Sequence, residues 1–162
     1  MQKPDSLRAA ITAADPELGR DPDRLLMWVE KGRIRAPMTE SRDFAYEFTL
    51  HLVVVNFEGH PSILFLAIND WLRVNQPDLL AAGAGAGAGR GYGFDADIMD
   101  NRKIDLEIQL ELTEQVVLHP REGGGWNLEH LAEPVLFPDD LPLSEPPALL
   151  RQIWWKDELL VP

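Results

Sequence analysis

The clearest alternating stretch of this sequence is FAYEFTLHLVVV, residues 44–55. Its even positions are all aromatic or aliphatic, whereas Glu47, Thr49 and His51 occupy odd positions. Successive side chains of a β-strand point to opposite faces, so this period of two predicts a strand with one apolar and one polar face. We expect a long amphipathic strand here, with a structural role for His51 on its polar face.

A second alternating stretch, residues 104–112, follows later in the chain. Apolar residues occupy its even positions, and Asp105, Glu107 and Glu111 lie on the other face. Residues 94–98 precede it across a short polar turn, which predicts an antiparallel hairpin with one apolar and one acidic face. Residues 116–118 are expected to extend the pairing, and residues 126–131 to add a further short strand.

Two helices are expected, one on each side of the first long strand. Asp5 or Ser6 can cap an N-terminal helix whose apolar residues follow helical spacing as far as Leu18. Pro61 suits the first position of a second helix, and residues 63–74 carry apolar side chains around much of its circumference.

Between the first helix and the long strand, residues 25–30 and 33–35 are expected to form two strands joined by a tight turn at Lys31 and Gly32. The order of helices and strands predicts an α+β fold: a mostly antiparallel sheet packed by two helices. We expect residues 1–133 to form this domain.

Residues 134–162 are expected to form a proline-rich, apolar C-terminal arm, because the prolines between positions 134 and 147 exclude a helix or a central strand. Its end carries candidate anchors for a neighbouring subunit: Leu149, Leu150, Ile153, Trp154 and Trp155. Packing of the arm on its own subunit is equally open.

The net charge of −12 argues against affinity for nucleic-acid backbones. Cysteine is absent, which removes disulfides, thiolate metal sites and cysteine catalysis. The N-terminus lacks the apolar core of a signal peptide, and no apolar run approaches the ~20 residues that span a bilayer. We expect synthesis in the cytoplasm and no membrane partner.

The run AAGAGAGAGRGYG, residues 81–93, has three possible interpretations: a nucleotide loop, a silk-like fragment or a flexible connector. A dinucleotide fingerprint would open a helix, whereas this run leads into an expected strand. The run is also too short for cross-β stacking. We expect a flexible loop whose glycines are Gly83, Gly85, Gly87, Gly89 and Gly91.

No motif of catalysis, cofactor binding or metal binding emerges. Residues 95–100 resemble the start of a calcium loop, but they lack the glycine that the EF-hand requires. The four histidines show no zinc spacing, and no serine lies in a nucleophile-elbow context. We therefore expect no enzyme, no cofactor and no metal.

Three long segments carry a resemblance to a known family. They are KPDSLRAAITAADPELGRDPDRLLMWVEKGRI (3–34), FAYEFTLHLVVVNFEGHPSILFLAINDWLRVNQPDLL (44–80) and FDADIMDNRKIDLEIQLELTEQVVL (94–118). In order and spacing they resemble the tail completion protein R family of P2-like contractile-tailed phages. The most telling pieces are KPDSLR (3–8), WLRVNQP (71–77) and LTE (112–114).

The resemblance implies a structural virion protein that acts late in tail assembly. By similarity to tail terminators, it implies a homo-oligomeric ring, most plausibly a hexamer, at the head-proximal end of the tail. Such a ring stops growth of the tube and sheath and offers a docking surface to neck proteins, while DNA passes through without specific binding. The face with Asp105, Glu107 and Glu111 is then a candidate lumen or rim surface.

Other functions remain open. A neck or head–tail connector protein would differ in ring size and position. A tail-assembly chaperone or a small cytosolic binding domain would be absent from the mature particle. An enzyme would rest on the glycine run alone.

Overall fold

The computed structural model describes residues 1–80, 91–99, 103–134, 153–155 and 158–161, with only the backbone described from residue 153 onward. The order of its elements is α1 (Lys3–Ala14), α2 (Pro16–Arg20), η1 (Pro22–Arg24), β1 (Leu25–Arg35), β2 (Phe44–Phe57), α3 (Pro61–Asn75), η2 (Pro77–Leu79), β3 (Gly93–Ile98), β4 (Ile104–Pro120), β5 (Trp126–His130), β6 (Ile153–Trp155) and β7 (Glu158–Val161), where η marks a short 3-10 helix.

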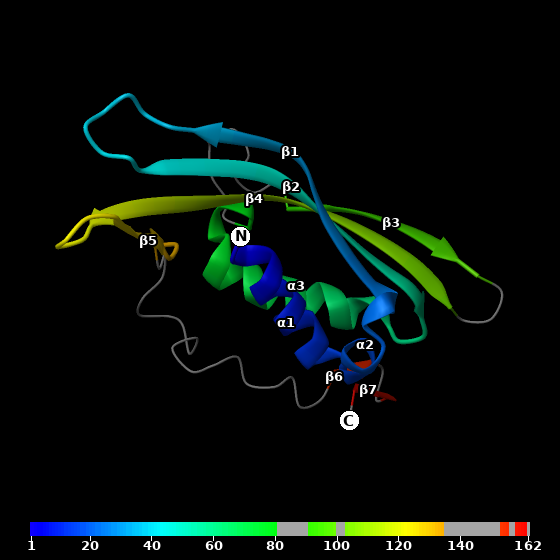
Figure 1. Cartoon of the computed structure of the whole chain (residues 1–162). Helices are drawn as coiled ribbons and strands as arrows, with labels where there is room; N and C mark the ends of the chain where they lie inside the picture. Colours follow the sequence, from blue (N-terminus) through cyan, green and yellow to red (C-terminus); the bar gives the residue numbers. More distant parts are fainter. Residues whose placement is uncertain (81–90, 100–102, 135–152, 156–157, 162) are drawn as a thin grey trace.

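Five strands form one antiparallel sheet in the order β1-β2-β4-β3, and β5 pairs with β4 beyond the end of β3. Strands β6 and β7 form a separate two-stranded sheet. Helices α1 and α3 pack against each other and lie on one side of the five-stranded sheet (Figure 1). This arrangement confirms the α+β fold, the two packing helices, both alternating strands, the hairpin of β3 and β4, and the short strand after residue 125.

The N-terminal helix begins earlier than its capping pattern predicts. Helix α1 starts at Lys3 with Pro4 in its first turn, so Asp5 and Ser6 lie inside the helix, and the prediction that either caps it is wrong. Pro4 fixes a helical φ and needs no N–H partner there. Helix α3 starts at Pro61 as expected, and the His60 ring accepts the N–H of Ser62.

Strand β1 is one strand, not the two strands and tight turn that the sequence predicts. Its first half, Leu25–Glu30, pairs with residues 49–54 of β2, and its last residues, Arg33–Arg35, pair with residues 45–47. The register shifts between these halves, where Lys31 has a φ of 53°. Strand β2 is long enough to pair with both halves, so Lys31 and Gly32 form an irregularity within the strand.

The core lies between the helices and the even-numbered side chains of β2 and β4. Leu50, Leu52, Leu110 and Leu112 are at most 1% exposed because α1 and α3 cover them. Burial of such side chains drives folding. The full cluster is Leu7, Ile11, Leu18, Leu25, Phe48, Leu50, Leu52, Val54, Phe57, Leu64, Ile68, Trp71, Leu72, Leu79, Leu106, Ile108, Leu110 and Leu112.

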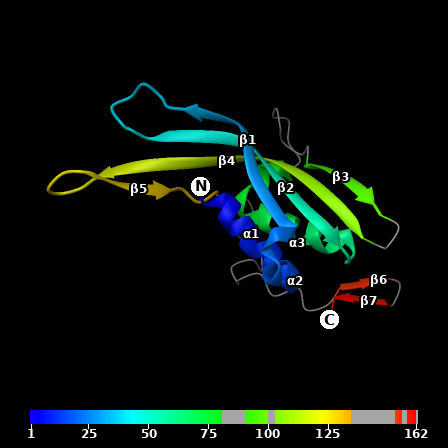
Figure 2. The same cartoon turned by 45° about the vertical axis from the view of Figure 1, so that its right-hand side comes forward.

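The sheet extends beyond the helices that cover it. The ends of β1 and β2 and the hairpin of β4 and β5 project past α1, and β3 lies at the far end of the sheet (Figures 1 and 2). Apolar side chains on the helix side are consequently exposed at these places: Ile34, Phe94, Ile98, Trp126 and Leu128. We call the opposite side of the sheet, which no described helix covers, the open face.

Candidate functional site

The open face carries the acidic residues that the sequence singles out. Strand register places Glu107 of β4 between Val53 of β2 and Asp95 of β3, and it pairs Asp105 with Asp97. Asp105 accepts the N–H of Asn56 at 2.7 Å. The predicted acidic face therefore exists on β4 and continues onto β3.

The carboxylates on this face differ in their surroundings. Glu107 lies 3.1 Å from Nδ1 of His51 and accepts a hydrogen bond from the Gln109 amide. Glu111, farther along β4, is exposed. Only Glu111 of the three predicted residues thus stands free of a partner among the contacts of the described residues.

His51 is buried on the open face although its strand position is polar. Its side chain is 9% exposed and stacks on Trp28, with ring centroids 5.0 Å apart. Carboxylates flank it: Glu107 at Nδ1 and Glu30 at 3.4 Å from Nε2, the latter without hydrogen-bond alignment. His51 lies on the polar face of β2, as the sequence predicts, but its partner Trp28 could not be foreseen, because it depends on the register between β1 and β2.

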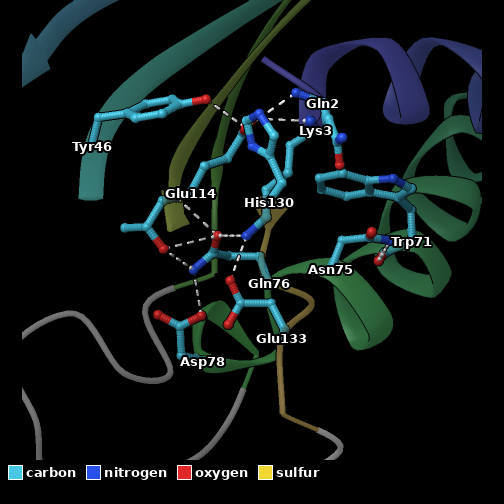
Figure 3. A network of polar contacts seen from close by, with 11 residues as sticks. Gln2, Lys3, Tyr46, Trp71, Asn75, Gln76, Asp78, Glu114, His130 and Glu133 are labelled. Carbon is cyan, nitrogen blue, oxygen red and sulfur yellow. Dashed lines mark hydrogen bonds and ion pairs between the residues drawn. The ribbon is translucent and has the colours of Figure 1, made fainter. Parts of the chain in front are cut away.

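A buried polar network lies on the other side of the sheet, where α1 begins (Figure 3). Its centre is Glu114 of β4, which is 4% exposed. Glu114 accepts the backbone N–H groups of Gln2 and Lys3 at 3.1 and 2.9 Å and the Tyr46 hydroxyl at 2.6 Å. Nδ1 of His130 lies 2.9 Å from the same carboxylate. One side chain thus ties the start of α1 to three strands.

Burial alone would raise the pKa of Glu114. The hydrogen bonds from Tyr46, Lys3 and Gln2, with the nearby His130, outweigh burial and hold the pKa of Glu114 below its usual value. The pKa of Tyr46 is raised, first because the phenol is buried and then because its neutral form donates to Glu114. Glu114 therefore stays ionised and Tyr46 stays protonated at neutral pH.

Gln76 takes the place of a strand partner beside β4. The edge of β4 between the segments paired with β3 and β5 has no neighbouring strand in the described chain. There the Gln76 side chain accepts the N–H of Thr113 at 3.0 Å and Nζ of Lys3 at 2.7 Å. Lys3 also contacts Glu133 at 2.6 Å. A partly buried edge N–H that would otherwise be unpaired is thereby satisfied.

The network joins the three short segments that carry the resemblance most clearly. Lys3 belongs to KPDSLR, Gln76 to WLRVNQP and Glu114 to LTE, and the indole N–H of Trp71 donates to the hydroxyl of Ser6 at 3.1 Å. In the sequence, the polar residues of these three segments share only their position beside apolar helical and strand residues. The fold brings them into contact.

The described residues line open grooves on the sheet. An open groove of about 770 Å³ runs from the open face, where Lys31, Arg33, Glu47 and Glu111 line it, to Gln76 and Tyr92 beside the edge of β4. No group of three or more acidic or histidine side chains that could hold a metal occurs in residues 1–80, 91–99 and 103–134. None of the described helices is long and apolar enough to cross a membrane.

Several predicted residues lie outside the described part of the chain. These are Gly83, Gly85, Gly87 and Gly89 of the expected loop, and the anchors Leu149 and Leu150. Gly91 is described: it has a φ of 64°, which suits glycine, and it donates its N–H to the carbonyl of Leu79.

The remaining anchors, Ile153, Trp154 and Trp155, form β6, which pairs with β7. Only their backbone is described. Whether this strand meets a neighbouring subunit therefore remains a prediction.

Comparison with known proteins agrees with the resemblance. The family model of the P2 phage tail completion protein R (GpR) matches residues 1–134. The tail completion protein R of Escherichia phage P2 is 34% identical over 146 residues, which is 90% of this chain and 90% of that protein. The similarity thus extends beyond residues 3–118, where the resemblance is clear in the sequence alone. No solved structure matches. The chain belongs to the P2 phage tail completion protein R family.

Proposed function

We propose that this protein completes a contractile phage tail, or a related tail-like particle, as a homo-oligomeric ring at the head-proximal end. The observation that carries the proposal is family membership over most of the chain. Its role is structural: the ring stops growth of the tube and sheath and docks neck proteins. It assembles in the bacterial cytoplasm and stays in the virion tail. The most plausible symmetry is sixfold.

The fold supports an assembly role through surfaces that one subunit leaves uncovered. The open face is unpacked in the described chain, and both edges of the sheet expose large apolar side chains, such as Ile34 and Ile98. Exposed apolar surface of this kind marks contacts between proteins. We propose that the carboxylates Asp105, Glu107 and Glu111 face the lumen or the rim of the ring, where their charge repels passing DNA.

The test combines three measurements. Light scattering of the purified protein should give the mass of an oligomer of ring size. Electron microscopy of assembled particles should show this ring at the tube end nearest the head. A protein that is monomeric in the particle, or that lies elsewhere, would contradict the proposal. Mass spectrometry of purified particles separates the alternatives: absence of the chain from finished particles would make it an assembly chaperone, and a position above the tube end would make it a neck connector.

We propose that the C-terminal arm contacts a neighbouring subunit through Leu149, Leu150, Ile153, Trp154 and Trp155. Truncation after Pro147 should then weaken ring formation and leave the unfolding midpoint of the subunit nearly unchanged. A shortened protein that assembles as well as the full chain would rule this contact out. A large drop in the unfolding midpoint would show that the arm packs on its own subunit.

A further inference from the structure

Within the described residues, the two outer edges of the five-stranded sheet carry opposite charges. Strand β1 forms one edge, and its last six residues, from Glu30 to Arg35, are all exposed. Strand β3 forms part of the other edge, and all six of its residues are exposed. The charged residues at the end of β1 after Glu30 are Lys31, Arg33 and Arg35, and those of β3 are Asp95 and Asp97.

The cations of β1 are only partly neutralised within the subunit. Arg33 and Arg35 share a single carboxylate, Glu47, at 3.8 and 3.1 Å, and their side chains remain 73% and 68% exposed. No ion pair involves Lys31 in the described residues. The neighbouring Glu30 accepts a hydrogen bond from the Trp28 indole instead. This edge therefore has positive charge to offer a partner.

The carboxylates of β3 face further carboxylates across the sheet. Asp95 lies opposite Glu107, and Asp97 lies opposite Asp105. Like charges directly opposite each other on adjacent strands are destabilising. Among the ion pairs of the described chain, none involves Asp95 or Asp97, and Lys103 is paired with Glu58 at 3.0 Å. This arrangement costs the isolated subunit stability and favours a cationic partner at this edge.

The two edges also match in how charge and apolar surface are divided between their faces. On β1, Arg33 lies on the open face beside Glu47, and Ile34 lies on the helix side beside Tyr46. On β3, Asp95 lies on the open face beside Glu107, and Phe94 and Ile98 lie on the helix side beside Ile108 and Ile104. Ile34, Phe94 and Ile98 are 72%, 55% and 78% exposed. When two copies lie edge to edge with like faces aligned, cations meet carboxylates and apolar side chains meet apolar side chains.

We propose that the β1 edge of one copy docks against the β3 edge of the next copy, with Arg33 and Arg35 facing Asp95 and Asp97. The partner is a second copy of this chain because the same chain supplies both matching edges, and its net charge of −12 disfavours DNA at the cationic edge. The contact is head to tail, which generates a ring when the rotation closes. The irregularity at Lys31 interrupts β1, so side chains rather than one continuous strand ladder form the contact.

This inference rests on the proposed ring and specifies its subunit boundary. The carboxylates nearest β3 then belong to the rim, at the contact between subunits. Glu111, farther along β4, is left for the lumen. Electrostatic complementarity of this kind chiefly selects partner and orientation, and apolar burial adds affinity.

The test is a charge swap in the full-length protein. We expect Arg33→Glu/Arg35→Glu, or Asp95→Arg/Asp97→Arg, to weaken ring association at least about tenfold in sedimentation or light scattering, because each places like charges across the contact. The variant with all four substitutions should recover association to within a few fold, since every contact then has its charges exchanged. Raising the salt to about 0.5 M should weaken the wild-type ring, because exposed charges are screened.

Two controls separate docking from folding. Glu17→Arg/Arg20→Glu exchanges charges on α2 and should leave association unchanged. Each variant should stay folded, and Asp95→Arg/Asp97→Arg should keep or raise the thermal midpoint, because it removes the like-charge pairs with Glu107 and Asp105. If Arg35→Glu destabilises the subunit through repulsion from Glu47, the neutral pair Arg33→Gln/Arg35→Gln replaces the charge-reversed pair and should still weaken association.

The other possible results contradict the proposed contact in different ways. If both charge-reversed pairs still form wild-type rings, the proposed contact is wrong, although the ring proposal stands. The contact is also wrong if the fourfold variant keeps a normal thermal midpoint but does not recover association. Intact rings that no longer join tails would assign these edges to a tube, sheath or neck protein instead. A wild-type chain that is monomeric within the particle would remove the ring proposal itself, and this contact with it.

Discussion

The middle of the sheet and its projecting ends share one apolar pattern but meet different surroundings. Leu110 and Leu128 both point to the helix side, yet Leu110 is fully buried and Leu128 is 57% exposed. Leu110 belongs to the core cluster with side chains of α1 and α3, whereas Leu128 lies on the hairpin of β4 and β5 that projects past α1 (Figure 1). Alternation in a strand thus predicts which way a side chain points, whereas coverage depends on elements far away in the sequence. The covered part stabilises the subunit, and we expect the uncovered part to serve association.

The strongest test of this contrast is a pair of matched truncations. Leu110→Ala should reduce the free energy of unfolding by about 2–5 kcal/mol, because it leaves a cavity in a close-packed core. Leu128→Ala, on the same face of the same sheet, should change it by less than about 0.5 kcal/mol. Urea unfolding of both variants measures the difference. Equal losses would show that the projecting end is also part of the core.

Glu114 marks the border between the two regions, and Glu114→Gln should reduce the free energy of unfolding at pH 7 by about 1–3 kcal/mol. The amide has one acceptor oxygen where the carboxylate has two, and its NH₂ group would face either the N–H of Lys3 or, at the other oxygen position, the donors of Gln2 and Tyr46. Urea unfolding at neutral pH measures this loss.

The same residue gives a prediction about pH. Because the folded pKa of Glu114 lies below its unfolded value of 4.5, its ionisation contributes stability at pH values above 4.5. That contribution is lost as the pH falls through the folded pKa. The difference in stability between wild type and Glu114→Gln should therefore shrink as the pH falls below 4.5. A difference that stays constant down to pH 3 would contradict the assigned pKa shift.

Tyr92 tests how firmly the chain just before β3 is held to the helix layer. Its hydroxyl donates to the Asn69 side chain at 3.1 Å, and burial raises its pKa to about 12. Tyr92→Phe should cost about 0.5–1.5 kcal/mol, the usual range for one hydrogen bond. Ultraviolet titration should find one tyrosine that ionises near pH 12. Since its folded pKa is raised, the stability it contributes is complete below pH 10 and is lost as the pH rises toward 12.

The smallest expected effect is at the free edge of β1. Ile34→Ser removes an exposed apolar side chain and should change the free energy of unfolding by no more than about 0.5 kcal/mol in either direction. Association is the sharper measurement, because the same change should weaken ring formation if the edge is a contact. An unaltered ring with unaltered stability would leave Ile34 without a role at the proposed boundary.

The long regular elements could be predicted because each satisfies one period over many residues. The even positions of β2 are apolar from 44 to 54, β4 alternates over residues 104–112, and α3 combines Pro61 at its start with apolar side chains around it. The start of α1 was misplaced because Asp5 and Ser6 fit a capping rule that Pro4 overrides. The tight turn predicted at Lys31 is wrong because β2 is long enough to pair with the residues on both sides of Lys31 and Gly32. This pairing keeps β1 extended where the local sequence favours a turn.

The polar network could not be predicted, because no local pattern identifies it. Gln2, Gln76 and Glu114 are brought together by contacts across most of the chain. Each residue alone fits an ordinary surface position. Only the placement of the start of α1 beside β4 turns them into one buried cluster (Figure 3).

The bond from the Lys3 N–H to Glu114 also determines the order in which the molecule can be completed during its synthesis. The two residues are 111 positions apart, so the first helix leaves the ribosome long before its anchor is made. Contacts of such long range are slow to form, and their segments stay exposed meanwhile. The N-terminal segment is therefore the first to be translated and among the last to be fixed, because a nascent chain that stops short of β4 lacks the Glu114 carboxylate that binds its first N–H groups.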